Sequence, residues 1–464
     1  MTLERAQPPL AADPRAVAAR ALAHGRRSRG ERLLNAAAIV AGLGFGATIG
    51  LAVSTESWRA LSAPGGWNTA IGRIAGFVGA YLMLVMVVLM ARIPSLERAV
   101  GQDRLARWHR RIGGWPIALI AAHGVFITFG YAESAQTGFL HQAWTLIDHY
   151  PDVLAASASF GLLLLVGIIS VRQVRRRVRY ETWWVTHLYV YLALALAFPH
   201  QIKTGAAFLG HPLTQLVWEA VWAAAAACVL VFRIGLPLWR SAYHQLRVVE
   251  VRTEAPGVVS VICRGRRLDR LQVSGGQFFR WRFIDPELWW HANPYSLSAL
   301  PFPPFLRLTV RELGDQSRAL ARLKPGTFVM IEGPYGAFTA EQRNGDRVLL
   351  VGAGVGVTPI RALLEGLPAH VDASVIVRSS TRDELVLHDE LTQLVEARSG
   401  RLFELIGPRS RVRIGSKELR KLVPDISRRD VYVCGPDGFA DRFIAAVKHA
   451  GVPDSRIHRE AFAF

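Results

Sequence analysis

Six apolar runs in the first half of the chain constrain its fold more than any other feature. Each is long enough to cross the ~30 Å hydrocarbon core of a bilayer. A single run of this length would also suit a helix buried in a soluble core. Six in succession, joined by short loops, favour a membrane α-helical bundle with six spans. The predicted spans lie near 35–53, 71–91, 112–131, 153–171, 184–200 and 213–233.

Arginines in the loops predict the orientation of this bundle. Six arginines join spans two and three and five join spans four and five, whereas the opposite side has Arg59 and Lys203. We therefore expect both termini in the cytoplasm of a bacterial cell, with a polar tail at 1–34 and no cleaved signal peptide. The loop arginines account for most of the net charge of +19, so this charge does not indicate nucleic-acid binding.

Three cysteines occur, Cys228, Cys263 and Cys434, and they form no CxxC or CxxCH pattern. A disulfide scaffold, a cysteine zinc site and a covalently attached c-type haem are therefore excluded.

Two predicted spans each carry a pair of histidines. His109 and His123 lie fourteen positions apart on the third, and His187 and His200 lie thirteen apart on the fifth. At 1.5 Å per residue these separations are ~21 Å and ~20 Å, so two helices offer imidazoles at two matching depths. A lone histidine would more simply be an interfacial or packing residue, but ionisable groups inside a membrane are costly and rarely incidental.

Paired imidazoles without a third ligand suit haem iron better than zinc or a di-iron site. We infer two b-type haems, one between His109 and His187 on the inner side and one between His123 and His200 on the outer side. On an ideal helix the histidines of span five lie about 140° apart, so a tilt or a distortion near Pro199 is expected.

The spacing His-x13-His on one span and His-x12-His on another resembles the NADPH oxidase and ferric reductase family of transmembrane haem proteins. The resemblance extends over nearly all of 35–464, because short β-like runs separated by Gly and Pro begin near residue 245. It implies a six-helix di-haem domain at 35–240, a β-barrel FAD domain at 245–341 and an α/β Rossmann-like NADPH domain at 346–464.

The stretch NPYSLSAL resembles the flavin-binding signature of the ferredoxin-reductase superfamily, in which an aromatic and two hydroxyl residues contact the flavin. Asn293 replaces the usual cation, and His291 is a candidate to supply that charge. The candidate FAD contacts are Asn293, Pro294, Tyr295, Ser296 and Ser298.

A second motif, GDQS, matches the G-x-x-S of the superfamily through Gly314 and Ser317. The free N–H groups of a helix N-terminus there would suit a pyrophosphate. On its own the motif would indicate only an N-capped surface helix.

The stretch VLLVGAGVGVTPIRALLE predicts a strand, a glycine loop and a helix, whose N-terminus would bind a dinucleotide phosphate. Its Thr-Pro pair resembles the nicotinamide-binding loop of the superfamily. The next strand ends in arginines rather than an acidic residue, which favours NADPH over NADH unless these arginines are only solvated. The candidate residues are Gly352, Gly354, Gly356, Thr358, Pro359, Arg378 and Arg382.

Near the C-terminus, VYVCGPDGF resembles the superfamily motif beside the nicotinamide, with Cys434 followed by Gly435 and Pro436. Outside this motif Cys434 would be taken for a buried apolar residue. In the superfamily a terminal aromatic residue covers the flavin ring. Phe464 matches it here, and Glu460 is expected near the same site.

The resemblance implies an oxidoreductase that passes electrons from cytosolic NADPH through FAD and two b-type haems to an acceptor on the outer face. FAD connects a hydride donor to haems that accept single electrons. A ferric complex is the favoured acceptor, because related oxidases tend to carry a further histidine where Ile127 stands. Alternatives are a superoxide-producing NADPH oxidase, a haem donor to a periplasmic partner protein, and a membrane scaffold without haem.

Glu219 is the candidate residue on the acceptor side, in the outer part of the sixth predicted span. It would relay protons or attract a cation near His200. Alternatively, it reaches the interface or pairs with Arg73.

Overall fold

The computed structural model describes residues 14–408, 411–412 and 414–460. The chain divides into two compact units. The helical unit comprises Leu34–Ile93 and Gln102–Arg233. The sheet unit comprises Pro94–Gly101 and the chain from Ile234 onward, together with the described residues before Leu34. The segment Pro94–Gly101, which the sequence analysis placed in the membrane domain, therefore belongs with the two sheets.

Five helical segments among the described residues are long and apolar enough to cross a membrane, so the prediction of six spans is confirmed for five. The run at 184–200 does form a helix, α10 (Tyr180–Thr204), but it does not reach the same hydropathy. Its tryptophan, tyrosine, threonine and histidine side chains and its charged ends account for the difference. The five segments are Arg32–Ser54, Gly66–Leu89, Arg104–Ala135, Val153–Ser170 and Pro212–His244.

Glycines allow α3 (Gly66–Leu89) and α6 (Gly114–Ala135) to pack closely. A Cβ atom added at Gly72 would lie 2.9 Å from the backbone nitrogen of Ile127, and one added at Gly79 would lie 3.0 Å from the Ile120 side chain. Small residues at such intervals let membrane helices approach each other.

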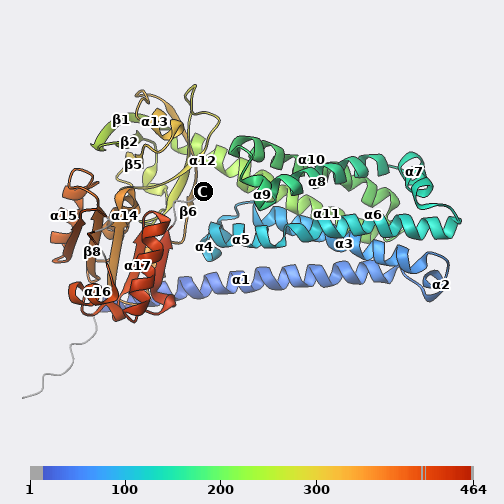
Figure 1. Cartoon of the computed structure of the whole chain (residues 1–464), viewed down its shortest axis with the longest axis horizontal. Helices are drawn as coiled ribbons and strands as arrows, with labels where there is room; N and C mark the ends of the chain where they lie inside the picture. The colour runs from blue at the N-terminus through green and yellow to red at the C-terminus, as the bar shows by residue number, and fades with distance from the viewer. Residues whose placement is uncertain (1–13, 409–410, 413, 461–464) are drawn as a thin grey trace, which may run out of the picture. The chain divides into compact units, whose positions relative to one another are not determined.

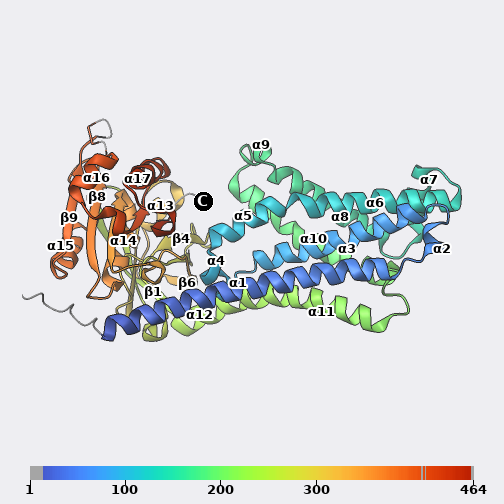
Figure 2. The ribbon, with the colours of Figure 1, turned by 90° about the horizontal axis from the view of Figure 1, so that it is seen from below.

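The third predicted span, 112–131, belongs to a longer helical segment, in which α5 (Gln102–Ile112) and α6 meet at Gly113 and the Gly113 N–H donates to the His109 carbonyl at 2.9 Å. Next to α6, the helices α8 (Val153–Ser170) and α10 lie side by side (Figures 1 and 2). The Ser159 hydroxyl of α8 donates to the Ala193 carbonyl of α10 at 2.7 Å. The other helices of this part of the chain are α1 (Pro14–Ser54), α2 (Trp58–Leu61), α7 (Phe139–His149), α9 (Arg172–Arg175), α11 (Pro212–Cys228) and the π-helix Val229–Gly235.

The sheet unit begins with a six-stranded antiparallel sheet in the order β4-β3-β6-β1-β2-β5. A bridge between Leu297 and Leu308 joins the segment after β4 to β5, so the two edges of the sheet meet as in a barrel. Its buried core includes Phe279, Trp281 and Ile331. The strands are β1 (Leu246–Ala255), β2 (Val258–Arg264), β3 (Phe278–Phe283), β4 (Asn293–Ser296), β5 (Phe305–Arg311) and β6 (Phe328–Tyr335).

Two short helices, α4 (Pro94–Val100) and α12 (Leu236–His244), pack on strand β6 of this sheet. The Ser241 hydroxyl of α12 accepts a hydrogen bond from the Ile331 backbone N–H at 3.2 Å.

A five-stranded parallel sheet follows in the order β11-β10-β7-β8-β9. Apolar residues of α14 and α15 form the core on one face, and those of α16 and α17 form it on the other. This doubly wound arrangement brings the carboxyl ends of its strands to one edge, where such sheets bind nucleotides. The elements are β7 (Arg347–Ala353), α14 (Val357–Gly366), β8 (Asp372–Ser379), α15 (His388–Glu396), β9 (Arg401–Ile406), α16 (Ser416–Leu422), β10 (Asp430–Cys434), α17 (Asp437–His449) and β11 (Ile457–Glu460).

Candidate functional site

The four predicted histidines of the helical unit meet in two pairs. The ring centroids of His109 and His187 are 6.1 Å apart, and those of His123 and His200 are 6.3 Å apart. The interplanar angles are 62° and 63°. His109 lies on α5 and His123 on α6, on either side of Gly113 in one helical segment.

Hydrogen bonds orient three of these imidazoles through their Nδ1 atoms. Nδ1 of His123 lies 2.8 Å from the Gly72 carbonyl oxygen, that of His200 lies 3.0 Å from the Thr204 hydroxyl, and that of His187 lies 3.4 Å from the Ser170 hydroxyl. An imidazole fixed through Nδ1 presents Nε2 to a metal, which is the usual arrangement of a metal-binding histidine.

The spacing of each pair fits one metal ion between two imidazoles. A first-row metal lies about 2 Å from a ligating imidazole nitrogen, which places the centroids of two opposed rings roughly 6 Å apart. Among residues 14–408, 411–412 and 414–460, no group of three or more His, Cys, Asp or Glu side chains could hold a metal. The pairs therefore suit a metal whose other ligands belong to a prosthetic group, as in haem.

Glu219 is half-buried on α11 and accepts a hydrogen bond from the Gln215 amide at 2.8 Å. The alternative pairing with Arg73 is not what the structure has, because Arg73 forms an ion pair with Glu56 at 2.8 Å. The acceptor-side interpretation of Glu219 stays a prediction.

The predicted flavin segment forms β4 and the turn after it. Asn293 donates to the Gln316 side chain at 2.9 Å, and burial raises the pKa of Tyr295 to about 12. A further cation lies beside this segment on β3, where Arg280 is paired with Pro294 in the sheet, donates to the Ala292 carbonyl at 2.8 Å and forms an ion pair with Glu332 at 3.6 Å. The sequence does not indicate Arg280, because pairing between strands is not visible in the order of residues, and the proposed role of His291 stays a prediction.

Gly314 and Ser317 form the N-terminal turn of α13 (Asp315–Leu320). The Ser317 hydroxyl accepts from the N–H groups of Leu313 and Gly314 at 2.8 Å and 3.0 Å. These two N–H groups precede the first turn of α13, so their hydrogen bonds do not decide between a pyrophosphate site and a capped surface helix, and the phosphate interpretation stays a prediction.

The glycine loop lies at the carboxyl end of β7, where two of its three glycines serve close packing. A Cβ atom at Gly356 would lie 2.4 Å from the Cys434 carbonyl oxygen, and one at Gly352 would lie 2.9 Å from the Val357 Cα. Gly354 has φ +56°, and an added Cβ there would have more space. Thr358 is buried, and its hydroxyl donates to the Val355 carbonyl at 2.9 Å.

A pocket opens beside this loop at the carboxyl ends of β7 and β8. Arg378 lines it, but its guanidinium donates to the carbonyls of Leu405 at 3.1 Å and Gly407 at 2.6 Å. Arg382 is 79% exposed and forms an ion pair with Glu404 at 3.2 Å. Arg382 is therefore the better placed of the two predicted arginines to meet a phosphate.

Cys434 and Glu460 lie side by side, because β10 and β11 pair in parallel at these two residues. Burial, together with the charge of Glu460, raises the pKa of the Cys434 thiol well above its ordinary value. Gly435 follows with φ +158° and is buried, whereas Pro436 is exposed. Phe464 lies outside the described residues.

These features define a class of protein: a membrane helical bundle with paired imidazoles, joined to a two-domain module whose parallel sheet has a nucleotide-binding topology. The comparisons agree with this class. Residues 75–198 match the family described as ferric reductase like transmembrane component. These residues are similar to a ferric-reductase-like transmembrane component, and the chain continues into the antiparallel and parallel sheets described above.

Curated relatives include an NADPH oxidoreductase of Mycobacterium tuberculosis, 24% identical over 238 residues that cover 49% of this chain and 62% of that protein. Respiratory burst oxidase homolog protein D of Arabidopsis thaliana is 26% identical over 217 residues, which cover 40% of this chain and 22% of that protein. This chain thus spans less than two thirds of each relative. Among solved structures, the FAD/NAD-binding domain of a nitric oxide dioxygenase from Vibrio cholerae is 24% identical, with a TM-score of 0.40 over 47% of this chain and 98% of that domain.

Proposed function

We propose that this chain transfers electrons from cytosolic NADPH across a membrane to an acceptor on the outer face, with FAD and two b-type haems as its cofactors. The observation that carries the proposal is the pair of opposed imidazoles found twice, with centroids 6.1 Å and 6.3 Å apart. In the orientation that the loop arginines favour, His109 and His187 are on the cytoplasmic side.

The residues of the sheet unit have distinct tasks in this proposal. Tyr295, Ser296 and Ser298 would bind FAD, which when bound accepts a hydride and releases single electrons. Gly354 allows the backbone to approach the dinucleotide, and Arg382 would bind the 2′-phosphate that distinguishes NADPH. Cys434 and Glu460 would border the nicotinamide.

Ferric iron is the favoured acceptor, and two observations bear on the choice. The match of residues 75–198 to the ferric reductase like component supports it. The similarity to the plant respiratory burst oxidase supports a superoxide-producing oxidase as the second candidate. At the position where related oxidases carry an additional histidine, Ile127 packs against Gly72, so this position offers no further imidazole. Reduction of a periplasmic partner protein is the third candidate.

The proposal is tested with purified protein in lipid nanodiscs under anaerobic conditions. Addition of NADPH is expected to reduce flavin first and then to produce the absorbance bands of reduced b-type haem. In His123→Ala, flavin reduction persists and the haem content falls by about half, because one of two imidazole pairs is broken. Unchanged haem content in this variant, or the absence of haem bands in the wild type, would contradict the proposal.

A further inference from the structure

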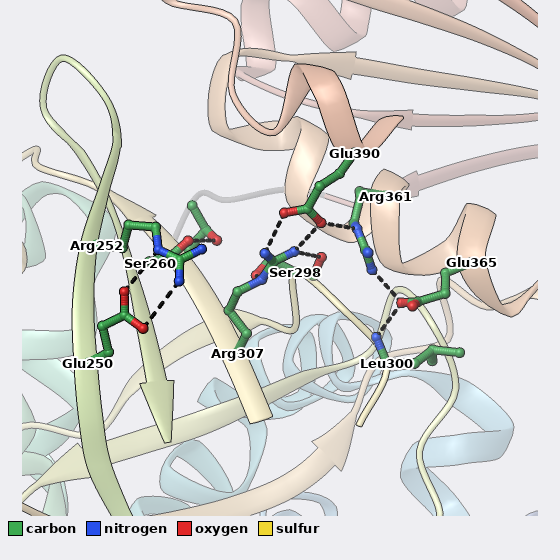
Figure 3. A network of polar contacts seen from close by, with 10 residues as sticks. Glu250, Arg252, Ser260, Ser298, Leu300, Arg307, Arg361, Glu365 and Glu390 are labelled. Carbon is green, nitrogen blue, oxygen red and sulfur yellow. Dashed lines mark hydrogen bonds and ion pairs between the residues drawn. The ribbon is translucent and has the colours of Figure 1, made fainter. Parts of the chain in front are cut away.

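A buried arginine on β5 holds the predicted flavin segment. Arg307 is 7% exposed, and its Nε atom donates to the Ser298 hydroxyl at 3.0 Å while Nη2 donates to the Ser298 carbonyl at 3.2 Å. The same guanidinium donates to both carboxylate oxygens of Glu390 at 2.6 Å and 2.7 Å (Figure 3). Glu390 belongs to α15 of the parallel-sheet domain, so this contact joins the two domains of the sheet unit.

A second connection runs parallel to the first. Glu390 also forms an ion pair with Nε of Arg361 on α14 at 2.8 Å, and Arg361 pairs in turn with Glu365 one turn later on the same helix. Glu365 accepts a hydrogen bond from the Leu300 backbone N–H at 2.7 Å (Figure 3). Leu300 is thus held directly by a carboxylate of the other domain, and Ser298, two residues before it, is connected to such a carboxylate through Arg307.

The two helices that carry these carboxylates, α14 and α15, begin at the pocket beside the glycine loop. This pocket is the proposed NADPH site and is called the nucleotide pocket below. Gly354 and Val357 line the pocket at the start of α14, and His388 and Leu391 line it in the first turn of α15. Glu390 lies between His388 and Leu391 in the sequence. A ligand that shifts the first turn of α15 would therefore move Glu390 and, through Arg307, the position of Ser298.

The charges in this network favour a fixed geometry. Burial raises the pKa of Glu390, but the hydrogen bonds and charges of Arg307 and Arg361 outweigh it and hold that pKa below its ordinary value. The carboxylate is therefore ionised at neutral pH. A bidentate contact between a guanidinium and a carboxylate also fixes the orientation of both groups. Such a contact transmits a displacement better than a single flexible hydrogen bond would.

We propose that Glu390 is a positioning residue that couples ligand binding in the nucleotide pocket to the flavin segment through Arg307 and Ser298. The inference rests on the proposed function, in which this segment binds FAD and the pocket binds NADPH. It concerns Glu390 and Arg307, which connect the pocket to Ser298 and are not among the proposed cofactor contacts.

Adenosine 2′,5′-bisphosphate tests the coupling because it has no nicotinamide to touch the flavin. The FAD dissociation constant of the full-length protein, stripped of flavin, is measured with and without a saturating concentration of this nucleotide. In the wild type the nucleotide changes the constant by about fivefold or more, within the usual range of coupling between sites. In Glu390→Gln the two constants agree within about twofold, while calorimetry shows that the nucleotide still binds.

Glu250→Gln is the matched control, because Glu250 forms an exposed pair with Arg252 on β1 and contacts neither Ser298 nor the pocket. This variant keeps the wild-type coupling. If Glu390→Gln does not fold, Glu365→Gln interrupts the second connection and is expected to weaken the coupling. Full coupling in Glu390→Gln, or no coupling in a wild type that binds both ligands, would overturn the inference. A wild type that binds neither ligand would instead refute the proposed function.

Discussion

Gly76 has no room for a side chain. A Cβ atom added there would lie 2.5 Å from Nδ1 of His123. Overpacking of this kind costs about 1–3 kcal/mol, so Gly76→Ala is expected to weaken cofactor binding at the His123–His200 pair by roughly 5- to 150-fold. The measurement is haem per chain, with a redox titration to show which pair is affected.

Gly124→Ala is the control for this prediction, because Gly124 is next to His123 on α6 and an added Cβ would meet nothing within 4 Å. Equal haem content and equal midpoint potentials in both variants and the wild type would show that the close contact at Gly76 does not matter.

Cys434 combines burial with a neighbouring carboxylate. Both effects disfavour the thiolate, so the thiol stays protonated at all pH values below its raised pKa. We expect Cys434 to remain unmodified by iodoacetamide at about pH 8, where an exposed cysteine reacts as a partial thiolate. Mass spectrometry of the native and the denatured protein measures the difference. Rapid alkylation of Cys434 in the native protein would refute this expectation and any role that requires a neutral thiol.

At the scale of elements, α10 is the helix whose hydropathy does not indicate a membrane span although its length does. Its 25 residues extend over ~37 Å, which exceeds the hydrocarbon thickness of ~30 Å. It is hydrogen-bonded to the apolar helix α8, and the Trp218 indole of α11 donates to its Gln201 side chain at 2.9 Å. Hydrogen bonds to neighbouring helices let a span carry polar residues that lipid would otherwise exclude.

We therefore expect α10 to cross the membrane. A cysteine in place of Leu209, which is 58% exposed beyond the end of α10, should react with a membrane-impermeant maleimide added to intact cells. A cysteine in place of Arg176, before its start, should react only after permeabilisation. The wild type, with Cys228 as its one cysteine in the helical unit, gives the background. The same labelling pattern at both positions would exclude a single crossing by α10.

Hydropathy predicted the helices of the membrane half well, because a long apolar run has few alternatives. It did not predict that the third helical segment begins at Arg104 rather than near residue 112, since the residues before 112 are basic rather than apolar. The packing of Pro94–Gly101 in the sheet unit was also not predicted, because the sequence pattern of a short polar helix does not indicate its packing partner.

The motifs of the sheet unit did not indicate all of its neighbours. Cys434 and Glu460 lie side by side because β10 and β11 pair in parallel, which neither motif predicted. Arg378 donates to backbone carbonyls, and its role in phosphate binding stays a prediction. The burial of Arg307 was not predicted, because it lies between Leu306 and Leu308, which are also buried. Alternation along a strand would place such a residue on the exposed face.

At the scale of the whole molecule, the identity of the acceptor separates the candidate functions. We expect the NADPH-reduced protein to be reoxidised faster by a ferric chelate than by dioxygen, because the residues at the His123 end offer no additional imidazole at Ile127. Stopped-flow absorbance in the b-type haem bands, with each oxidant at the same concentration, measures both rates. Faster oxidation by dioxygen, with superoxide as product, would assign the oxidase function instead.

The groups that orient the imidazoles differ in how mutation can reach them. His123 is held by the Gly72 carbonyl, a backbone oxygen that depends on no side chain, although an added Cβ at Gly72 would collide with Ile127. His187 and His200 are held by the hydroxyls of Ser170 and Thr204, which a single codon change can remove. In a population of variants, the contact to His123 is thus protected from side-chain loss. The hydrogen bonds to His187 and His200, in contrast, can be lost or altered by a substitution at Ser170 or Thr204.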